Sequence, residues 1–501
     1  MFFLTDPNDN QVISMEFVPV KTLLFTLSLA VPFVCFATEP LVQVNDVQRS
    51  GVQRSGVQRD DSDGRATDWP SFRGAGAKGV ADGHELPGVW NADAEQGEVT
   101  GVQWRVEVPG LGHSSPVVVG NQVLIATAIA EEGEPPLQVG RGGRPDAADD
   151  NGIQSWVVLS YDKKTGKELW RSVAHRGVPR ATRHAKATHA NTSVAVHGDR
   201  VVAFFGSEGL HCFDLQGKHI WSRDLGVINI SKYGIGWGYA SSPAIHEDRI
   251  AVICDDPSQP FVAVLRLSDG QEIWRRKRED DCERSWGTPA IFSHPSRTQV
   301  VINGWPWIVA YDFENGDELW RIHGGGDNPV PTPFEAHGNI FITNAHGAQS
   351  PIYVVEPGAS GDITPPDDDA LTQNEDRKRG VVWSTLKGGS YMSTPVVYGD
   401  YLYLGSSSGI LRCFNAKTGE KVYEKRLGSG ASMIASLVAG DEKIYCASEN
   451  GYVYVVAAGP EFEIQSRNAM GQPCFASPAI SEGVIYLRTT ASLLAIHSLD
   501  E

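Results

Sequence analysis

The strongest constraint on the fold of this chain is a repeated pattern of four short apolar segments separated by tight turns. Residues 391–427 contain the clearest copy, YMSTPVVYGDYLYLGSSSGILRCFNAKTGEKVYEKRL. Segments of this length, rich in Val, Tyr, Leu and Ile and interrupted by Gly, Asp and Ser, predict antiparallel strands joined by hairpins. One sheet of four such strands cannot bury both faces, so the pattern requires neighbouring sheets of the same kind.

Two recurring signals indicate that these neighbours are present. One is a Ser, Thr or Pro pair at the opening of each predicted first strand, and the copies are mostly about forty to fifty residues apart. The copies are Ser115-Pro116, Thr192-Ser193, Ser242-Pro243, Thr288-Pro289, Thr332-Pro333, Thr394-Pro395, Ala435-Ser436 and Ser477-Pro478. The other signal is the turn D-x-x-T-G followed by Trp, complete in residues 162–170, which predicts the hairpin between a third and a fourth strand.

An aromatic residue recurs on the predicted fourth, outermost strand. A large ring at this position can lie against the next sheet and cover the seam between the two. The predicted blade-docking residues are Trp104, Trp170, Trp221, Trp274, Trp320, Trp383 and Tyr423. Four strands per repeat, this period and an aromatic residue near the end of each repeat are typical of a β-propeller.

The two ends of the repeat region complement each other. Residues 475–497 supply three strands, whereas residues 101–108 supply one spare strand that carries Trp104. Pairing them removes an open sheet edge and closes the ring. We therefore predict an all-β fold over residues 101–501: an eight-bladed β-propeller of four-stranded antiparallel sheets, closed by an N-terminal strand that completes the last blade.

The N-terminal residues predict export. In residues 1–37, Lys21 is followed by an apolar run of about fourteen residues that ends near the small residue Ala37, which is typical of a signal peptide. Met15 is an alternative start, because the residues before it are polar. The run is shorter than the roughly twenty residues of a membrane span, so we expect no transmembrane segment in the mature chain and a location in the bacterial periplasm or cell envelope. An uncleaved membrane anchor is the alternative.

Two further segments precede the repeats. Residues 38–66 repeat the pentapeptide Val-Gln-Arg-Ser-Gly, and such low complexity predicts a disordered linker. Residues 67–100 are not a repeat. Because their aromatic residues would be costly to leave in water, we expect this extension to pack on the propeller. These aromatic residues are Trp69, Phe72 and Trp90.

Charge and cysteine content exclude several classes of function. The formal net charge is −18, which argues against nucleic acid as a partner, since phosphate recognition requires a basic surface. Six cysteines follow the predicted signal peptide, and they show no C-x-x-C spacing of the kind that binds metal. We expect free, buried thiols.

The residues just before each first strand are the best candidates for ligand contact, because the innermost strands of a propeller border its central channel. The candidates at this channel mouth are His113, Lys186, His189, Trp237, Tyr239, Arg284, Trp286 and Tyr391. An alternative is that these side chains only hold neighbouring sheets in register. His184 and His189 are five residues apart in a predicted loop, a spacing that does not fix a metal site, so we predict no metal. We also predict no catalytic residue.

The turn motif of residues 161–170, with related copies at 269–274, 315–320 and 415–423, resembles the repeats of pyrroloquinoline-quinone-like (PQQ-like) propellers of the WD40-like and quinoprotein superfamily. The resemblance covers about residues 101–501. The segment W-P-S-F-R-G further resembles exported planctomycete-type members. The family includes PQQ-dependent alcohol dehydrogenases and also non-enzymatic periplasmic scaffolds similar to a lipoprotein that assists outer-membrane assembly.

The dehydrogenase branch implies a disulfide between adjacent cysteines over the quinone, a catalytic Asp, and calcium held by Glu and Asn. No two cysteines are adjacent in this chain, and the haem motif C-x-x-C-H is missing. We therefore expect a monomeric, non-catalytic scaffold without a cofactor, which binds a protein or peptide partner in the cell envelope. The alternatives are a PQQ-dependent alcohol or sugar dehydrogenase with PQQ and calcium, and a carbohydrate- or peptide-binding propeller.

Overall fold

A computed structural model describes most of the chain after the predicted linker. The described residues are 68–133, 135–140, 147–232, 235–279, 282, 284–366, 372–373 and 380–498. The predicted signal peptide (1–37) and linker (38–66) lie outside them. The helices in the described part are the short turns η1 (Ala75–Ala77) and η2 (Gly206–Glu208), and none of the described helices has the length and hydropathy needed to cross a bilayer.

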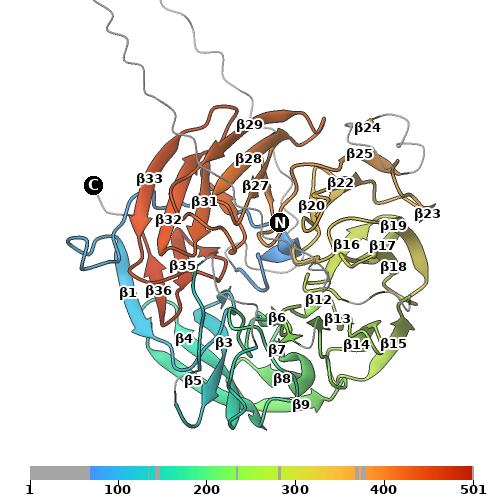
Figure 1. Ribbon diagram of the computed structural model, residues 1–501. Helices are drawn as coiled ribbons and strands as arrows, with labels where there is room; N and C mark the ends of the chain where they lie inside the picture. Colours follow the sequence, from blue (N-terminus) through green and yellow to red (C-terminus); the bar gives the residue numbers. More distant parts are fainter. Residues whose placement is uncertain are drawn as a thin grey trace, which may run out of the picture. The chain divides into compact units, whose positions relative to one another are not determined.

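Eight antiparallel sheets are arranged around a central axis (Figure 1), as the sequence predicts. From the axis outward, blade 1 contains β2 (Val117–Val119), β3 (Gln122–Ala130), β4 (Gln154–Asp162) and β5 (Glu168–Gly177), and blade 2 contains β6 (Ala195–His197), β7 (Arg200–Phe204), β8 (Leu210–Asp214) and β9 (His219–Arg223). Blade 3 contains β12 (Ala244–His246), β13 (Arg249–Cys254), β14 (Phe261–Arg266) and β15 (Glu272–Lys277), and blade 4 contains β16 (Ala290–His294), β17 (Arg297–Ile302), β18 (Trp307–Asp312) and β19 (Glu318–His323).

Blades 5 to 8 continue the ring in chain order. Blade 5 contains β20 (Phe334–Ala336), β21 (Asn339–Thr343), β22 (Ile352–Val355) and β25 (Val381–Thr385), and blade 6 contains β26 (Val396–Tyr398), β27 (Tyr401–Gly405), β28 (Ile410–Asn415) and β29 (Lys421–Arg426). Blade 7 contains β30 (Val438–Gly440), β31 (Lys443–Ser448), β32 (Tyr452–Ala457) and β33 (Ile464–Ala469), and blade 8 contains β34 (Ala479–Ser481), β35 (Val484–Arg488), β36 (Ser492–Ile496) and β1 (Val102–Glu107). Outside this pattern lie β10 (Ser231–Lys232), β11 (Ile235–Gly236), β23 (Gly361–Asp362) and β24 (Thr372–Gln373).

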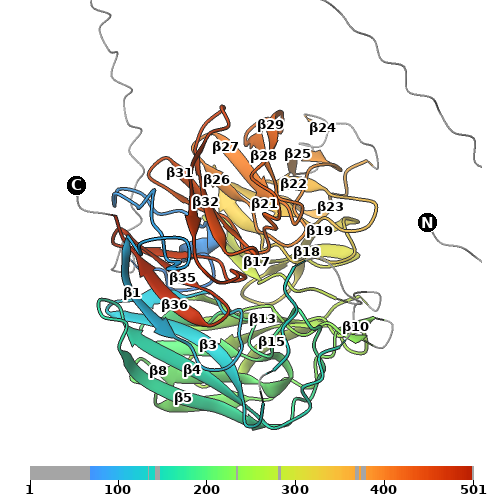
Figure 2. The same ribbon diagram turned by 60° about the vertical axis from the view of Figure 1, so that its left-hand side comes forward.

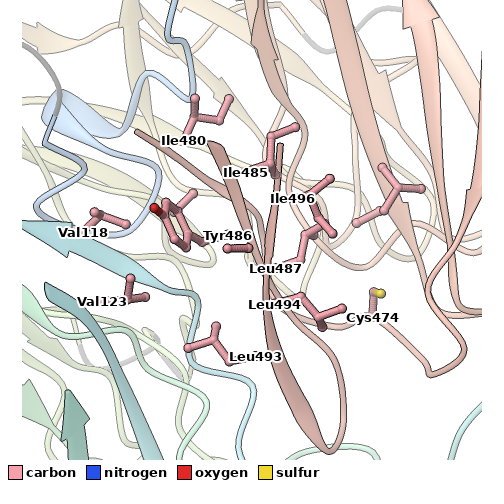
Figure 3. Close-up of a cluster of buried hydrophobic side chains, with 14 of the residues drawn as sticks. Val118, Val123, Cys474, Ile480, Ile485, Tyr486, Leu487, Leu493, Leu494 and Ile496 are labelled. Carbon is pink, nitrogen blue, oxygen red and sulfur yellow. The ribbon is translucent and has the colours of Figure 1, made fainter. Parts of the chain in front are cut away.

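Blade 8 contains strands from both ends of the propeller. Strand β1 pairs antiparallel with β36, and Trp104 lies opposite Ala495. The last blade buries an apolar cluster that includes Leu487 and Leu494, and Val118 and Val123 of blade 1 pack against it (Figure 3). This shared core joins blade 8 to blade 1.

The openings of the first strands form a closed ring of hydrogen bonds. In every blade, the backbone N–H of one Ser or Thr donates to the side-chain hydroxyl of its counterpart in the next blade, over distances of 2.8 to 3.2 Å. The last of these bonds, from Ser477 to Ser115, completes the circle. We call this set the hydroxyl ring; its members are Ser115, Ser193, Ser242, Thr288, Thr332, Thr394, Ser436 and Ser477.

The outermost tryptophans seal the seams between blades in a repeated geometry. The indole N–H of Trp170 donates to the carbonyl oxygen of Leu215, the residue that follows the third strand of the next blade. Equivalent bonds of 2.9 to 3.0 Å are made by Trp104, Trp221, Trp274 and Trp383. The glycine of the neighbouring turn is required here, because a Cβ atom added at Gly217 would lie 2.6 Å from the ring of Trp170.

Two predicted docking residues contact their neighbours differently. The indole of Trp320 donates to the side chain of Gln299 in its own blade, at 2.9 Å. Ala359 and Ile363, from the loop inserted in blade 5, belong to the same apolar cluster as Trp320. The ring of Tyr423 meets Phe462 of blade 7 edge to face at 5.5 Å. Loop residues therefore close both of these seams, in place of the turn glycine that meets the indole ring at most of the other seams.

The extension before β1 crosses one end of the ring. Trp69 exchanges two backbone hydrogen bonds with Val118 of blade 1, and the carbonyl oxygen of Pro70 accepts one from Val196 of blade 2. Further on, Ala439 of blade 7 pairs with the backbone of Gly79 and Ala81. The segment therefore connects blades that lie on different sides of the ring, and its blue ribbon lies at the centre of Figure 1.

Arg73 fixes this segment to blades 6 and 7. Its guanidinium group donates to the carbonyl oxygens of Thr394, Pro395 and Leu437, and the residue is 1% exposed. Burial lowers the pKa of Arg73 to about 9. This cation is held by peptide dipoles of two blades, which makes it a cross-link between them.

Replacing Trp383 tests the seam geometry. We expect Trp383→Ala to lower the free energy of unfolding by about 3–5 kcal/mol, as large core truncations do, because this ring is fully buried. Trp383→Phe should cost less, since it retains most of the packing and loses the N–H bond. Urea unfolding measures both, and Ile273→Ala on an exposed site is the control. Equal midpoints for Trp383→Ala and the control would contradict the seam assignment.

The contribution of the hydroxyl ring to stability can be tested at Thr394, whose hydroxyl accepts a hydrogen bond from the N–H of Thr332 at 3.0 Å. Thr394→Val keeps the shape and removes the acceptor, leaving a buried N–H without a partner. We expect a loss of about 1–3 kcal/mol in urea unfolding, and near-complete retention of stability in Thr394→Ser. A valine variant as stable as the serine variant would show that the ring contributes little.

Candidate functional site

A cavity of about 420 Å³ lies on the axis of the propeller. All eight members of the hydroxyl ring line it, so one level of its wall is a circle of Ser and Thr side chains. Aromatic and imidazole side chains make up much of the remaining lining; they are Phe72, His113, His184, Trp237, Trp286, Tyr391 and Phe475.

The cavity has a floor and a mouth. Trp69 and Ala81 of the extension bond to Val118 and Ala439, which follow the hydroxyl-ring residue of blades 1 and 7 by three positions. Phe72 lies between Trp69 and Ala81 in the sequence, and it lines the cavity. Residues that precede the ring hydroxyl, such as His113 and Trp286, line it from the opposite end. The extension therefore closes one end of the channel. Figure 2 shows the ring obliquely, turned by 60° from the view of Figure 1.

The structure brings together most of the predicted channel-mouth residues. Five of them line the cavity: His113, Lys186, Trp237, Trp286 and Tyr391. His189 and Tyr239 instead border a separate cavity of about 20 Å³. Arg284 lines neither of these cavities; it is buried, and its guanidinium lies 5.2 Å from the ring of Trp305.

Stacked pairs hold several mouth rings in place. The imidazole of His184 lies parallel to Trp237, with ring centroids 5.0 Å apart and an interplanar angle of 2°. His113 stacks on Phe475 at 4.5 Å. Such pairing adds to the burial of each ring and fixes its orientation, so the cavity presents flat, preformed faces.

The charges at the mouth are paired. The ammonium group of Lys186 lies 2.7 Å from the carboxylate of Glu449, and it donates to the carbonyl oxygen of Gly140. The same carboxylate accepts the N–H of Gly140. These contacts tie the loop inserted in blade 1 to blade 7 across the mouth.

A second buried network supports the loop that carries Lys186. The carboxylate of Asp150 lies 2.6 Å from Arg183 and 3.2 Å from His189. Burial alone would raise the pKa of Asp150, but its bonds with His189 and Arg183 lower it. His189 therefore positions this loop and does not line the axial cavity.

Sequence reasoning missed the contributions of Phe72, Asp150 and Glu449. Phe72 was expected to pack on the propeller, not to form the floor of its channel. Asp150 lies in the loop inserted in blade 1 and Glu449 lies in a hairpin turn of blade 7, and each bonds to a residue far away in the sequence. No local pattern identifies such partners.

The described lining does not fit PQQ and calcium. It includes no Asp or Glu, although calcium prefers carboxylate oxygens. Within the described residues, no group of three or more His, Cys, Asp and Glu side chains is arranged to hold a metal. The six described cysteines are free and buried, and burial raises the pKa of the Cys212 thiol to about 12.

The buried imidazole of His113 should make the stability of the fold depend on pH. Burial lowers its pKa to about 4, whereas the unfolded chain takes up a proton near pH 6.5. Stability should therefore fall as the pH drops from 6.5 towards 4, by up to roughly 3 kcal/mol from this residue. His211 contributes in the same direction. In His113→Gln the slope should be shallower in urea unfolding at pH 4.5 and 7; an unchanged slope would contradict the assignment.

Comparison with known proteins agrees with this architecture. An assembly factor BamB from Shewanella oneidensis is 22% identical over 316 residues, 61% of this chain and 67% of the relative. The BamB of Burkholderia pseudomallei is 29% identical over 110 residues, which span 22% of this chain and only 28% of that protein. A quinohemoprotein alcohol dehydrogenase from Pseudomonas putida is similar in fold, with a TM-score of 0.53, 11% identity, and coverage of 86% of this chain and 80% of that structure.

A family model described as outer membrane protein assembly factor BamB matches residues 74–255 and 259–498. The match covers nearly the whole described propeller and most of the chain. The protein therefore belongs to this family of PQQ-like repeat β-propellers.

Proposed function

We propose that the protein is a non-catalytic, exported scaffold that binds protein partners in the bacterial cell envelope. Membership of a family whose relatives are named assembly factors supports this function. The proposal includes residues 1–37 as a signal peptide, residues 38–66 as a linker, a mature chain without a membrane span, and a monomer. The described lining of the cavity contains no carboxylate, which is compatible with a binding function.

The outer edges of the blades are the surface best suited to a protein segment. Strand β23 pairs with β19 of blade 4, and β24 pairs with β25 of blade 5. Two blades of this molecule thus already carry a fifth strand on the outer side. An extended segment of a partner can add to an open edge in the same way, through its backbone hydrogen bonds.

Blade 1 offers the longest edge of this kind. Its outer strand β5 has ten residues, and among the described strands it pairs only with β4. Leu169 and Val173 are 46% and 55% exposed. They lie two positions before and two positions after Arg171, and because side chains alternate along a strand, all three lie on the same face of β5. This edge combines free backbone groups with apolar contacts, and we assign it as the main docking strand.

The docking strand is tested by crosslinking and capture from an envelope fraction of the native host. We expect Leu169→Asp/Val173→Asp to lose the protein partner that the unchanged chain retains, because charges on the edge oppose strand addition. Ile220→Asp/Ile273→Asp, on the outer strands of blades 2 and 3, is the matched control and should retain it. Equal capture by both double variants would refute docking at β5. Capture that survives protease treatment of the fraction would argue against a protein partner.

The dehydrogenase alternative has its own test. Its support is a likeness in fold at 11% identity, and the lining lacks carboxylates. After incubation with PQQ and calcium, we expect no bound chromophore after gel filtration and no alcohol- or glucose-dependent dye reduction. Stoichiometric chromophore with substrate-dependent reduction would overturn the scaffold proposal.

A further inference from the structure

The hydroxyl ring has unused hydrogen-bonding capacity that faces the cavity. Each ring oxygen accepts one backbone N–H from the preceding blade. Among the described residues, no contact shows any of these eight hydroxyls donating its own proton to a protein acceptor. A hydroxyl has one donor and two acceptor positions, so a circle of O–H groups remains available to whatever occupies the cavity.

This capacity decides between classes of ligand. An apolar side chain that filled the cavity would cut these donors off from water, and each donor left without an acceptor costs about 1–3 kcal/mol. Even a few such groups would cancel the gain from burying an aromatic ring, about 1.5–3 kcal/mol. The ligand must therefore bring several oxygen acceptors at the level of the ring.

The charges exclude ions as the preferred ligand. Lys186, the lysine among the lining residues, is paired with Glu449 at 2.7 Å. The lining has no carboxylate to attract a cation. A charged ligand would lose its hydration without gaining an opposite charge, whereas a neutral molecule with many oxygens would not.

The mouth adds flat apolar faces above the oxygen-binding level. Trp237 is backed by His184 at 5.0 Å, and Phe475 is backed by His113 at 4.5 Å. The C–H faces of a pyranose ring pack on such aromatic faces, while its hydroxyl and ring oxygens point outward to hydrogen-bonding groups. Because Phe72 closes the far end, a long chain cannot pass through.

We propose that the axial cavity is a saccharide site that binds the neutral terminal sugar units of a glycan, with the hydroxyl ring donating to sugar oxygens and Trp237 and Trp286 stacking on sugar faces. The volume of about 420 Å³ is within the range of small-ligand sites. This site is independent of protein docking at β5, which lies on the outer side of blade 1.

Isothermal titration calorimetry of the full propeller with maltose, cellobiose and N,N′-diacetylchitobiose tests the proposal. At least one of these disaccharides should bind at a single site, and the tetrasaccharide of the same series should bind no more than about twofold tighter, because only an end enters. Trp237→Ala and Trp286→Ala should each weaken binding at least ~10-fold. Trp170→Phe, at an outer seam, is the matched control and should bind as the unchanged chain does.

Three results would overturn the proposal. They are no saturable binding of any of the three disaccharides up to ~50 mM, equal binding by Trp237→Ala and Trp170→Phe, and tighter binding of N-acetyl-L-tryptophanamide than of every sugar. Far-UV circular dichroism shows whether each variant is folded. The double variant Leu169→Asp/Val173→Asp should still bind sugar, because the saccharide site is separate from the docking strand. The saccharide proposal and the docking-strand proposal can therefore fail independently of each other.

Discussion

A closed circle of hydrogen bonds around the axis is the constraint on which the rest of this propeller depends. Each blade contributes one backbone donor and one hydroxyl acceptor, so a blade cannot move along the axis without breaking a bond on both sides. Because the participating residues are buried, breaking these bonds would leave polar backbone groups unpaired at a cost in stability. The circle fixes the spacing of the first strands, and this spacing in turn sets the width of the cavity.

The outer seams and the N-terminal extension act on the same ring from other directions. Indole N–H bonds to the following blade fix the periphery. Arg73 and the backbone of Trp69 fix the end of the channel. The extension thus stabilises the fold and also turns an open channel into a cavity with a floor, which makes selective binding of a small group feasible.

The sequence predicts the eight-bladed ring because its signals are local and repeated. In most copies a hydroxyl stands at the strand opening, and a turn glycine stands four residues before a Trp or Tyr. The first strands begin two or three residues after the first residue of each opening pair, since the opening residues bond to the next blade instead of to their own second strand.

Long-range contacts could not be predicted in this way. Arg73 bonds to carbonyl oxygens more than 300 residues away, and Trp320 is covered by an insertion instead of a turn. For the site, the sequence identifies five of the residues that line the cavity but not its floor, because the position of Phe72 depends on where the extension crosses the finished ring.

The pairing of β1 with β36 has a consequence for biosynthesis. The bond that completes the circle joins Ser477 to Ser115, 362 residues apart, and β1 finds its partner only when the final strand has been made. Until then the seam between blade 8 and blade 1 stays open, and the apolar side chains that blade 1 contributes to it, such as Val118 and Val123, lack their packing against blade 8. An incomplete chain with exposed apolar surface is prone to aggregation, and the large sequence separation of β1 and β36 slows the step that closes the ring.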